Sequence, residues 1–224
     1  MTFEIDENIY DVIIQRKNNK NLYIRVTNDL KIKVTCSKLY TKLMIKSVLK
    51  QNIKSIKKML INQRCINERE SKEKYMLLGK PIKVIYENVK KVKELDDKII
   101  VKDDFMLNNW YKTKAKDIFL KYLDEAYEVF EEKIPYPKLK IRTMKTRWGV
   151  CNKKDNSVTL NLELIKKDHK YLNYVIVHEL SHFVHFNHSK SFWNTVEKYC
   201  PDYNKVRKEL RKWLHQKIII KLSI

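Results

Sequence analysis

Hydrophobic residues recur along this chain with two spacings, every second residue in some segments and about every 3.6 residues in others. The alternation of Leu22, Ile24 and Val26 with polar residues is typical of a half-buried strand. Extended segments of this kind predict strands at residues 9–16, 21–27, 30–35, 75–78, 82–87, 98–102, 138–144 and 158–165. Several of these segments are separated by asparagine, aspartate, glycine or proline, which favour turns.

The helical spacing marks three long segments outside these strands. Residues 41–62 form an amphipathic pattern in which lysines occupy the faces that the apolar residues leave. A second apolar stripe covers residues 108–132 and begins at asparagine, which suits an N-cap. The third segment, 190–199, follows Ser189, which also suits an N-cap. We expect a helix in each.

The order of these segments predicts the α+β class. A β-rich part with one long helix comes first, and a part with a small sheet and several helices follows. We place a soft boundary near residue 105. This gives a β-rich N-terminal region over residues 1–105 and a second domain over residues 106–224.

One segment concentrates the candidate chemistry. Four of the six histidines lie between His178 and His188, and they include the pattern His178-Glu179-Leu-Ser-His182. On a helix, residues four apart share a face about 6 Å apart along the axis, so these two imidazoles converge on one Zn²⁺ ion. Glu179 projects about 100° round the helix, close to a metal-bound water but poorly placed as a ligand. This is the position that the general base of a zinc hydrolase requires.

The helix that carries this motif has an apolar face on its other side. The residues that form it are Ile176, Val177, Leu180, Phe183 and Val184. Packing of this face turns His178 and His182 towards a cleft or solvent. The alternative is a pair of surface histidines, which we disfavour because of Glu179 and the histidines that follow. By chance the pattern is expected about 0.01 times in a chain of this composition.

A third protein ligand is needed if one zinc position is to stay open for water, and two histidines compete for this role. In an unbroken helix the Cα of His185 lies about 10.5 Å along the axis from that of His178, too far to share a site. His188 can reach the metal only if the helix stops first, and Asn187 is a suitable stop. We therefore expect His188 as the third ligand and His185 still on the helix. Two acidic residues on later helices remain as distant alternatives, Glu197 and Glu209.

Several segments together are similar to a known family. They are Thr146-Arg-Trp-Gly-Val-Cys151, Val158-Thr-Leu-Asn-Leu-Glu-Leu-Ile165, Tyr174-Val-Ile-Val-His-Glu-Leu-Ser-His182 and Asn187-His-Ser-Lys-Ser-Phe-Trp193. Over about residues 138–215 the chain resembles the YgjP-like zinc metallopeptidases, which are related to the WLM and SprT-like groups. The family pattern runs Arg-Trp-Gly-Ser-Cys, a strand ending Leu-Ile, His-Glu-Leu-x-His and Asn-His-Ser-x-x-Phe-Trp. Val150 stands where the family usually has serine.

The resemblance implies a zincin-like metallopeptidase domain with a small sheet and an active-site helix. It also implies a polypeptide substrate, Zn²⁺ bound by His178, His182 and His188, and Glu179 as the catalytic base. In related zinc peptidases a strand such as 158–165 borders the cleft and pairs with the substrate backbone, although it can equally be a core strand. Arg147 is a candidate for binding substrate as an anion or oxyanion contact, with a structural ion pair as the alternative.

The net charge of +21 bears on partners more than on fold. Only eight of the 48 basic residues are arginine, which is preferred for bidentate recognition of phosphate, and the lysines are spread along the chain. We interpret them mainly as a solvated coat, with nucleic acid as a second candidate partner.

Cysteine usage and hydropathy predict a cytoplasmic protein without a membrane segment. The four cysteines form no Cys-x-x-Cys pair, as is usual for reduced thiols. The first residues lack the apolar core of a signal peptide. No run approaches the ~20 apolar residues that span a bilayer, and the apolar tail at residues 218–224 is too short.

The function predicted from these features is that of a zinc-dependent hydrolase, foremost a metallopeptidase. One alternative is a nucleoside-triphosphate pyrophosphatase, which the basic surface would suit. The chain has only two glycines, Gly79 and Gly149, so it lacks a glycine-rich phosphate cradle. The other alternative is a DNA-associated protein with a structural zinc, and an intact Glu179 argues against it.

Overall fold

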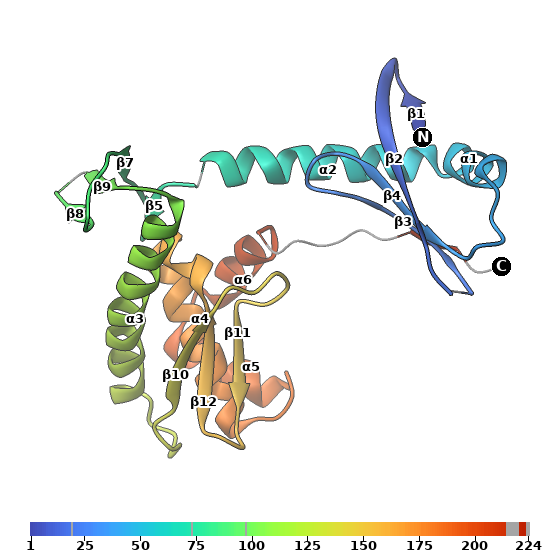
Figure 1. Ribbon diagram of the computed structural model, residues 1–224. Helices are drawn as coiled ribbons and strands as arrows, with labels where there is room; N and C mark the ends of the chain where they lie inside the picture. Colours follow the sequence, from blue (N-terminus) through green and yellow to red (C-terminus); the bar gives the residue numbers. More distant parts are fainter. Residues whose placement is uncertain (19, 73, 97, 214–219, 223–224) are drawn as a thin grey trace. The chain divides into compact units, whose positions relative to one another are not determined.

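The computed structural model describes residues 1–18, 20–72, 74–96, 98–213 and 220–222. Contacts divide the chain into two compact units, Met1–Lys72 with Gln216–Ile224 and Glu73–His215 (Figure 1). This division differs from the boundary expected near residue 105. The reason is that Ile99 and Val101 pack into the same hydrophobic core as Leu107, which joins the strands before residue 105 to the helix that follows.

The first unit contains a five-stranded sheet with the order β1-β2-β4-β3-β13. Its strands are β1 (Thr2–Ile5), β2 (Asn8–Arg16), β3 (Leu22–Val26), β4 (Ile32–Cys36) and β13 (Ile220–Leu222). The pair β2–β4 is parallel and the other pairs are antiparallel. The three strands predicted at the start of the chain are confirmed. Of the apolar tail at residues 218–224, only 220–222 lie within the described residues, and they pair with β3.

Two helices, α1 (Lys42–Gln51) and α2 (Ile53–Lys72), occupy the segment where one helix was predicted. The break is at Asn52, whose side-chain amide donates to the Val48 carbonyl at 2.9 Å. Beyond residue 62, α2 continues through a mainly polar segment, in which Gln63, Arg64 and Arg69 are good helix formers. The apolar pattern alone does not predict this extension. The core of this unit is formed by the sheet and the apolar faces of these helices, and Val34 of β4 belongs to the same buried cluster as Ile45 and Leu49 of α1.

The second unit begins with short strands. They are β5 (Met76–Leu77), β6 (Lys80–Pro81), β7 (Lys83–Tyr86), β8 (Lys93–Glu94) and β9 (Lys98–Val101). The first two form a hairpin and the others a sheet of order β7-β9-β8. Gly79 turns the hairpin with φ of +79°, and a Cβ there would lie 3.0 Å from the Asp168 Cα, so the turn requires glycine.

A three-stranded sheet of order β10-β12-β11 supports the candidate site. The strands are β10 (Lys138–Arg142), β11 (Gly149–Asn152) and β12 (Ser157–Asn161), with β12 parallel to β10 and antiparallel to β11. The predicted strand 158–165 is too long. It ends at Asn161, whose side chain caps a 3-10 helix (Leu162–Lys166) by accepting the Glu163 N–H at 3.2 Å. β12 is also the central strand, so it cannot border the cleft as an edge.

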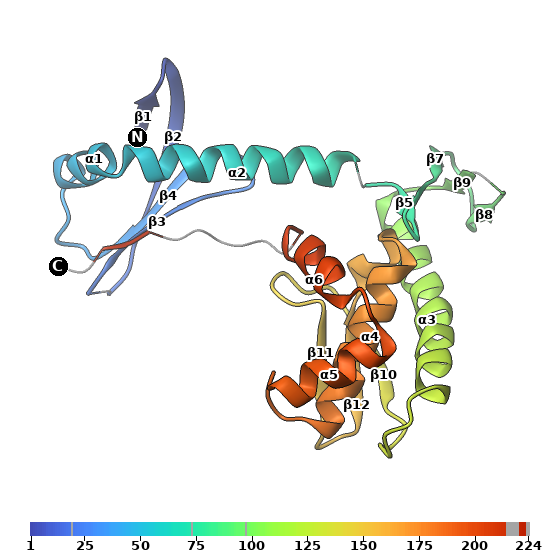
Figure 2. The ribbon, with the colours of Figure 1, turned by 180° about the vertical axis from the view of Figure 1, so that it is seen from behind.

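Four helices pack with this sheet, namely α3 (Asp104–Glu128), α4 (His169–Val184), α5 (Lys190–Tyr199) and α6 (Tyr203–Arg211). Helix α4 contacts β11 and β12, α5 and α6 contact α4, and α3 runs beside β10 (Figures 1 and 2). Helix α3 begins four residues before the predicted start because the Asp103 side chain accepts the Met106 N–H at 2.8 Å. The mixture of helices and small sheets confirms the predicted α+β class.

No helix among the described residues has the length and apolar character needed to cross a membrane.

Candidate metal centre

Helix α4 carries the histidine motif and buries its opposite face. Asp168 caps its start by accepting the Lys170 N–H at 2.9 Å. Ile176, Val177 and Leu180 are buried in the core, as the sequence pattern predicted, whereas the side chain of Val184 is 37% exposed at the helix end. The packed face fixes the rotation of the helix, which leaves the edge with the two histidines towards a cleft.

The helix ends at Val184, three residues before the predicted stop at Asn187. His185 is the C-cap and has extended backbone (φ −117°, ψ 128°), so the expectation that it stays on the helix is wrong. Its ring nitrogen Nε2 lies 3.0 Å from the Thr195 hydroxyl on α5, which holds it away from the other histidines. This early turn brings His188 back towards α4.

Three histidines meet at the end of this turn. Side-chain nitrogens of His178, His182 and His188 all lie within 4.8 Å of one another. The Nε2 atoms of His178 and His188 are 3.2 Å apart. Two nitrogens bound tetrahedrally to one zinc at about 2.05 Å lie about 3.3 Å apart, so this pair already has the spacing that a shared ion needs.

Aromatic rings hold these imidazoles in place. The buried Phe192 ring has its centroid 4.6 to 4.9 Å from those of His178, His182 and His188. Trp193 stacks on His188 at 5.4 Å and an interplanar angle of 22°. Both residues lie on α5, whose start is capped by the Ser189 side chain as predicted. The apolar support restricts the ring orientations without competing for the nitrogens.

The electrostatics favour neutral imidazoles. Burial, reinforced by the neighbouring histidines, lowers the pKa of His178 to about 3. Burial is also the main cause of the lowered pKa values of His182 and His188. Neutral imidazoles have the free lone pairs that bind a metal.

Two further observations bear on the fit of a metal. The Nδ1 atom of His178 is buried and has no hydrogen-bond partner among the described residues. The Nδ1 atom of His182 lies 3.3 Å from the His185 carbonyl oxygen, which can only accept a hydrogen bond. That contact requires the proton on Nδ1 and leaves Nε2 of His182 free as a donor to a metal. The three residues therefore fit a nitrogen-bound divalent ion.

Glu179 is the most buried acidic side chain near these histidines, with 4% of its surface exposed. Its carboxylate lies against β11, where the backbone N–H of Cys151 donates a hydrogen bond to it. A Cβ on Gly149 would lie 2.4 Å from Oε1 of this carboxylate, so the missing side chain makes the space. Neither contact is visible in the sequence, although the glycine and cysteine belong to the segment that carried the family resemblance.

Burial raises the pKa of Glu179 to about 8, while the Cys151 N–H and the charge of Arg147 oppose the rise. The folded protein therefore binds this proton more tightly than the unfolded chain does. Ionisation of Glu179 therefore lowers the free energy of unfolding, and this destabilisation grows as the pH rises from about 4.5 to about 8.

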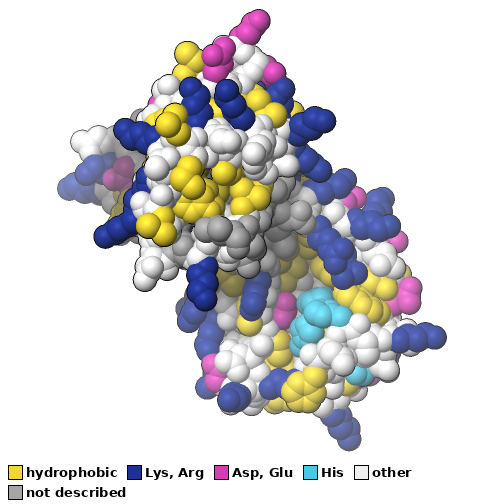
Figure 3. Space-filling view, turned by 90° about the vertical axis from the view of Figure 1, so that its right-hand side faces the viewer, with side chains coloured by type: hydrophobic (Ala, Val, Ile, Leu, Met, Phe, Trp, Pro, Cys, Tyr) yellow, Lys and Arg dark blue, Asp and Glu magenta, His cyan; other side chains and the backbone are white. Residues whose placement is uncertain are grey.

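A cleft of about 510 Å³ lies over the histidines and Glu179. Strand β11 and the following lysines form one wall, and the exposed Arg147 reaches it from the preceding loop. Lys153 places its ammonium group 3.7 Å from the centroid of the Phe186 ring, which also lines the cleft. In the space-filling view, histidine side chains reach the surface as a group, with basic and apolar side chains around them (Figure 3).

The two acidic alternatives for a third ligand lie elsewhere. Glu209 accepts a hydrogen bond from the Tyr171 hydroxyl at 2.7 Å and pairs with Lys170 at 3.1 Å. Glu197 is exposed on α5 and does not join the group of the three histidines. Among the described residues, the geometry thus brings together the three histidines that the sequence put first.

Comparisons with known proteins show which family the chain matches. The family described as YgjP-like, metallopeptidase domain, matches residues 20–213. Among solved structures, the metallopeptidase zymogen abylysin of Pyrococcus abyssi is 24% identical, with 45% of this chain and 98% of that chain covered and a TM-score of 0.40. The metallopeptidase zymogen jannalysin of Methanocaldococcus jannaschii is also 24% identical, with 43% and 93% covered and a TM-score of 0.34. No curated protein matches the chain.

The family description supports a peptidase and gives no support to the pyrophosphatase or DNA-associated alternatives. Its match extends over most of the sequence, including the histidine cluster and both units of the fold. The chain therefore belongs to the YgjP-like family and is a metallopeptidase.

Proposed function

We propose that this metallopeptidase is a zinc enzyme of the His-Glu-x-x-His type, in which His178, His182 and His188 hold the metal and Glu179 is the general base. The observation that carries the proposal is the convergence of three neutral imidazoles beside a buried carboxylate that lines the same cleft. A site with three protein ligands leaves a position open for chemistry, as in other catalytic zinc sites.

Zinc suits this donor set because imidazole nitrogens bind it well, and within the described part of the chain the group has nitrogen donors instead of the oxygen-rich shell that calcium or magnesium prefers. When bound, zinc supplies Lewis acidity that activates water and polarises a substrate carbonyl. The protein's own contribution is the rigid placement of the three rings by Phe192 and Trp193.

Glu179 accounts for the movement of protons. Its carboxylate accepts a proton from the attacking water, whose oxygen bonds to the scissile carbonyl carbon. The same carboxyl group then gives the proton to the leaving amine as the C–N bond breaks. Its raised pKa of about 8 suits a group that both takes up and releases a proton near neutral pH.

Strand β11 is an edge strand to which the backbone of an extended substrate could hydrogen-bond. This strand pairs only with β12 among the described residues, and it forms a wall of the cleft. The Trp148 carbonyl accepts a hydrogen bond from the Asn161 N–H at 2.9 Å, so the backbone groups of Gly149 and Cys151 point away from β12. The Cys151 N–H donates to Glu179, which leaves the Gly149 N–H and the carbonyls of Gly149 and Cys151 for a substrate backbone. An extended polypeptide can pair with this edge, and Arg147 at the mouth would contact a carbonyl or carboxylate of the substrate.

Zinc analysis and cleavage assays with Glu179→Gln test this proposal. The variant should keep its zinc and lose cleavage of an unfolded polypeptide by about a hundredfold, because it removes the base and leaves the ligands. Loss of zinc from this variant, or full activity, would refute the assignment. Release of pyrophosphate from a nucleotide, together with no cleavage across a broad peptide library, would refute the choice of substrate.

A further inference from the structure

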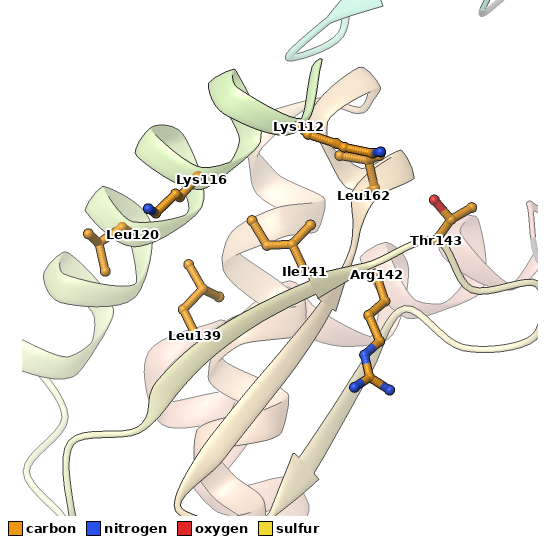
Figure 4. A pocket seen from close by; sticks show the side chains of 8 residues that line it. All are labelled: Lys112, Lys116, Leu120, Leu139, Ile141, Arg142, Thr143 and Leu162. Carbon is orange, nitrogen blue, oxygen red and sulfur yellow. The ribbon is translucent and has the colours of Figure 1, made fainter. Parts of the chain in front are cut away.

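A second hollow lies apart from the histidine cleft, between α3 and β10 (Figure 4). Its volume is about 490 Å³, within the range of sites that take a small ligand or a few residues of a peptide. The apolar part of its lining is formed by Leu120, Leu139, Ile141 and Leu162. Leu139 and Ile141 alternate along β10 and point towards α3, where Leu120 lies (Figure 4). The hollow thus has an apolar floor.

Basic side chains border this floor on both sides. Lys112 and Lys116 precede Leu120 at intervals of four residues, so all three form one row along α3. Arg142 extends from β10 on the side away from α3 (Figure 4). The described residues provide no ion pair or side-chain hydrogen bond for any of these three cations. Their charge is therefore uncompensated and favours an acidic occupant.

The backbone of β10 offers a third feature. Lys138 donates its N–H to the Asn156 carbonyl, and the parallel register sets Lys138 opposite Ser157. In a parallel pair, alternate residues direct their amide groups to the same neighbour. The amide groups of Leu139 and Ile141 therefore face away from β12, and no described strand lies on that side of β10. An unpaired strand edge borders the apolar floor.

We propose that the groove between α3 and β10 binds an acidic, extended polypeptide segment, which pairs with the free edge of β10. Main-chain hydrogen bonds to Leu139 and Ile141 would give affinity. An apolar side chain would cover the floor, and carboxylates would meet Lys112 and Lys116. The five residues of β10 span about 16 Å, which sets the length of the bound segment at about five residues.

Charge decides between an acidic partner and a second copy of this chain. A net charge of +21 makes two copies repel each other, whereas an acidic segment is attracted to the unpaired cations. The groove is separate from the cleft over Glu179, since the two share no lining residue. The inference consequently does not depend on the assignment of the catalytic residues.

A binding assay on the full chain tests this site. The probe is a fluorescein-labelled peptide of eight residues with threonine at every second position and valine and glutamate taking turns at the others. Valine and glutamate then share the face turned to α3, and binding is followed by anisotropy at about 50 mM salt. The variant Lys112→Glu/Lys116→Glu should weaken binding at least tenfold. The matched control Lys133→Glu/Lys208→Glu has the same net charge but changes lysines outside the groove, and it should bind within threefold of wild type.

A second comparison changes the peptide and leaves the protein intact. N-methylation of every second residue of the probe blocks main-chain pairing while it preserves the side chains, and it should weaken binding at least tenfold. Equal binding of the methylated peptide would overturn strand addition. Equal losses in the two charge variants, or no binding of the parent probe up to 1 mM, would overturn the site itself. Unchanged unfolding temperatures would show that each variant is folded.

Discussion

Gly149→Ala is a direct test of how the sheet controls the candidate base. A Cβ at this position would lie 2.4 Å from Oε1, 2.7 Å from Cγ and 2.8 Å from Cδ of Glu179. Ordinary van der Waals contact begins at 3.4 Å, so the carboxylate must move by about 1 Å. Glu179 has little room for this movement because it is buried and accepts the Cys151 N–H.

The expected effect follows from that displacement. A misplacement of about 1 Å in a catalytic group costs about a hundredfold in rate, or about 2.7 kcal/mol of transition-state stabilisation. We therefore expect kcat/KM of Gly149→Ala to fall about a hundredfold with zinc content unchanged, since the three atoms nearest to the added Cβ all belong to Glu179. Initial rates on a fluorogenic peptide, with zinc measured after dialysis, provide the test.

A double mutant shows whether Gly149 acts through Glu179. In a Glu179→Gln background the base is already absent, so adding Gly149→Ala should change the residual rate by less than about threefold. Val150→Ala, at the next position of β11, serves as the matched control and should stay within about tenfold of wild type. A full hundredfold loss in both backgrounds would refute the reasoning, as would wild-type activity of Gly149→Ala.

Three further predictions concern the metal, the carboxyl group and the surface charge. His188→Ala should lose zinc on dialysis while His185→Ala keeps it, and the reverse pattern in zinc analysis would contradict the ligand assignment. In the zinc-free protein, Glu179→Gln should be more stable than wild type at pH 8.5 by at least about 1.4 kcal/mol, the equivalent of one pKa unit, because the buried carboxylate is then ionised. Denaturant titration should show that this difference disappears near pH 4.5, where Glu179 is protonated, and a difference independent of pH would exclude this cause. Anisotropy with labelled duplex DNA should show no binding at about 50 mM salt if the lysines are a solvated coat, whereas binding that falls steeply with salt would indicate a nucleic-acid partner.

Strands and the motif helix were predictable because their signals are local. The strands predicted at residues 9–16, 21–27 and 30–35 lie within two residues of those observed. The N-cap at Ser189 and helix α5 also match, since a cap and an apolar face act over a few residues. The break at Asn52 was missed because the apolar pattern runs on through it, whereas the cap bonds of the Asn52 backbone and side chain mark the end of the first helix only in the structure.

The candidate site was predictable only in the part that lies on one helix and its following turn. The pairing of His178 with His182 follows from helical geometry, and the approach of His188 requires only that the helix stop. The stop came three residues early, at Val184, because no local signal distinguishes residues 185 to 187. For strand 158–165 the sequence left a cleft edge and a core strand as equal alternatives, and the sheet order supports the core strand. Sequence patterns could not decide between them because strand order depends on pairing between distant segments.

The proton affinity of Glu179 is a property of the sheet rather than of the motif. On an isolated helix the same spacing would leave this side chain in water with an ordinary pKa. In the folded chain, Gly149 and the Cys151 N–H admit the carboxylate into a buried position. The loop before β11 is held in turn by Asn161, whose side-chain amide donates to the carbonyls of Met144 at 2.7 Å and Arg147 at 2.8 Å. The buried amide at the end of β12 therefore fixes where β11 begins, and that start sets the environment of the base on α4.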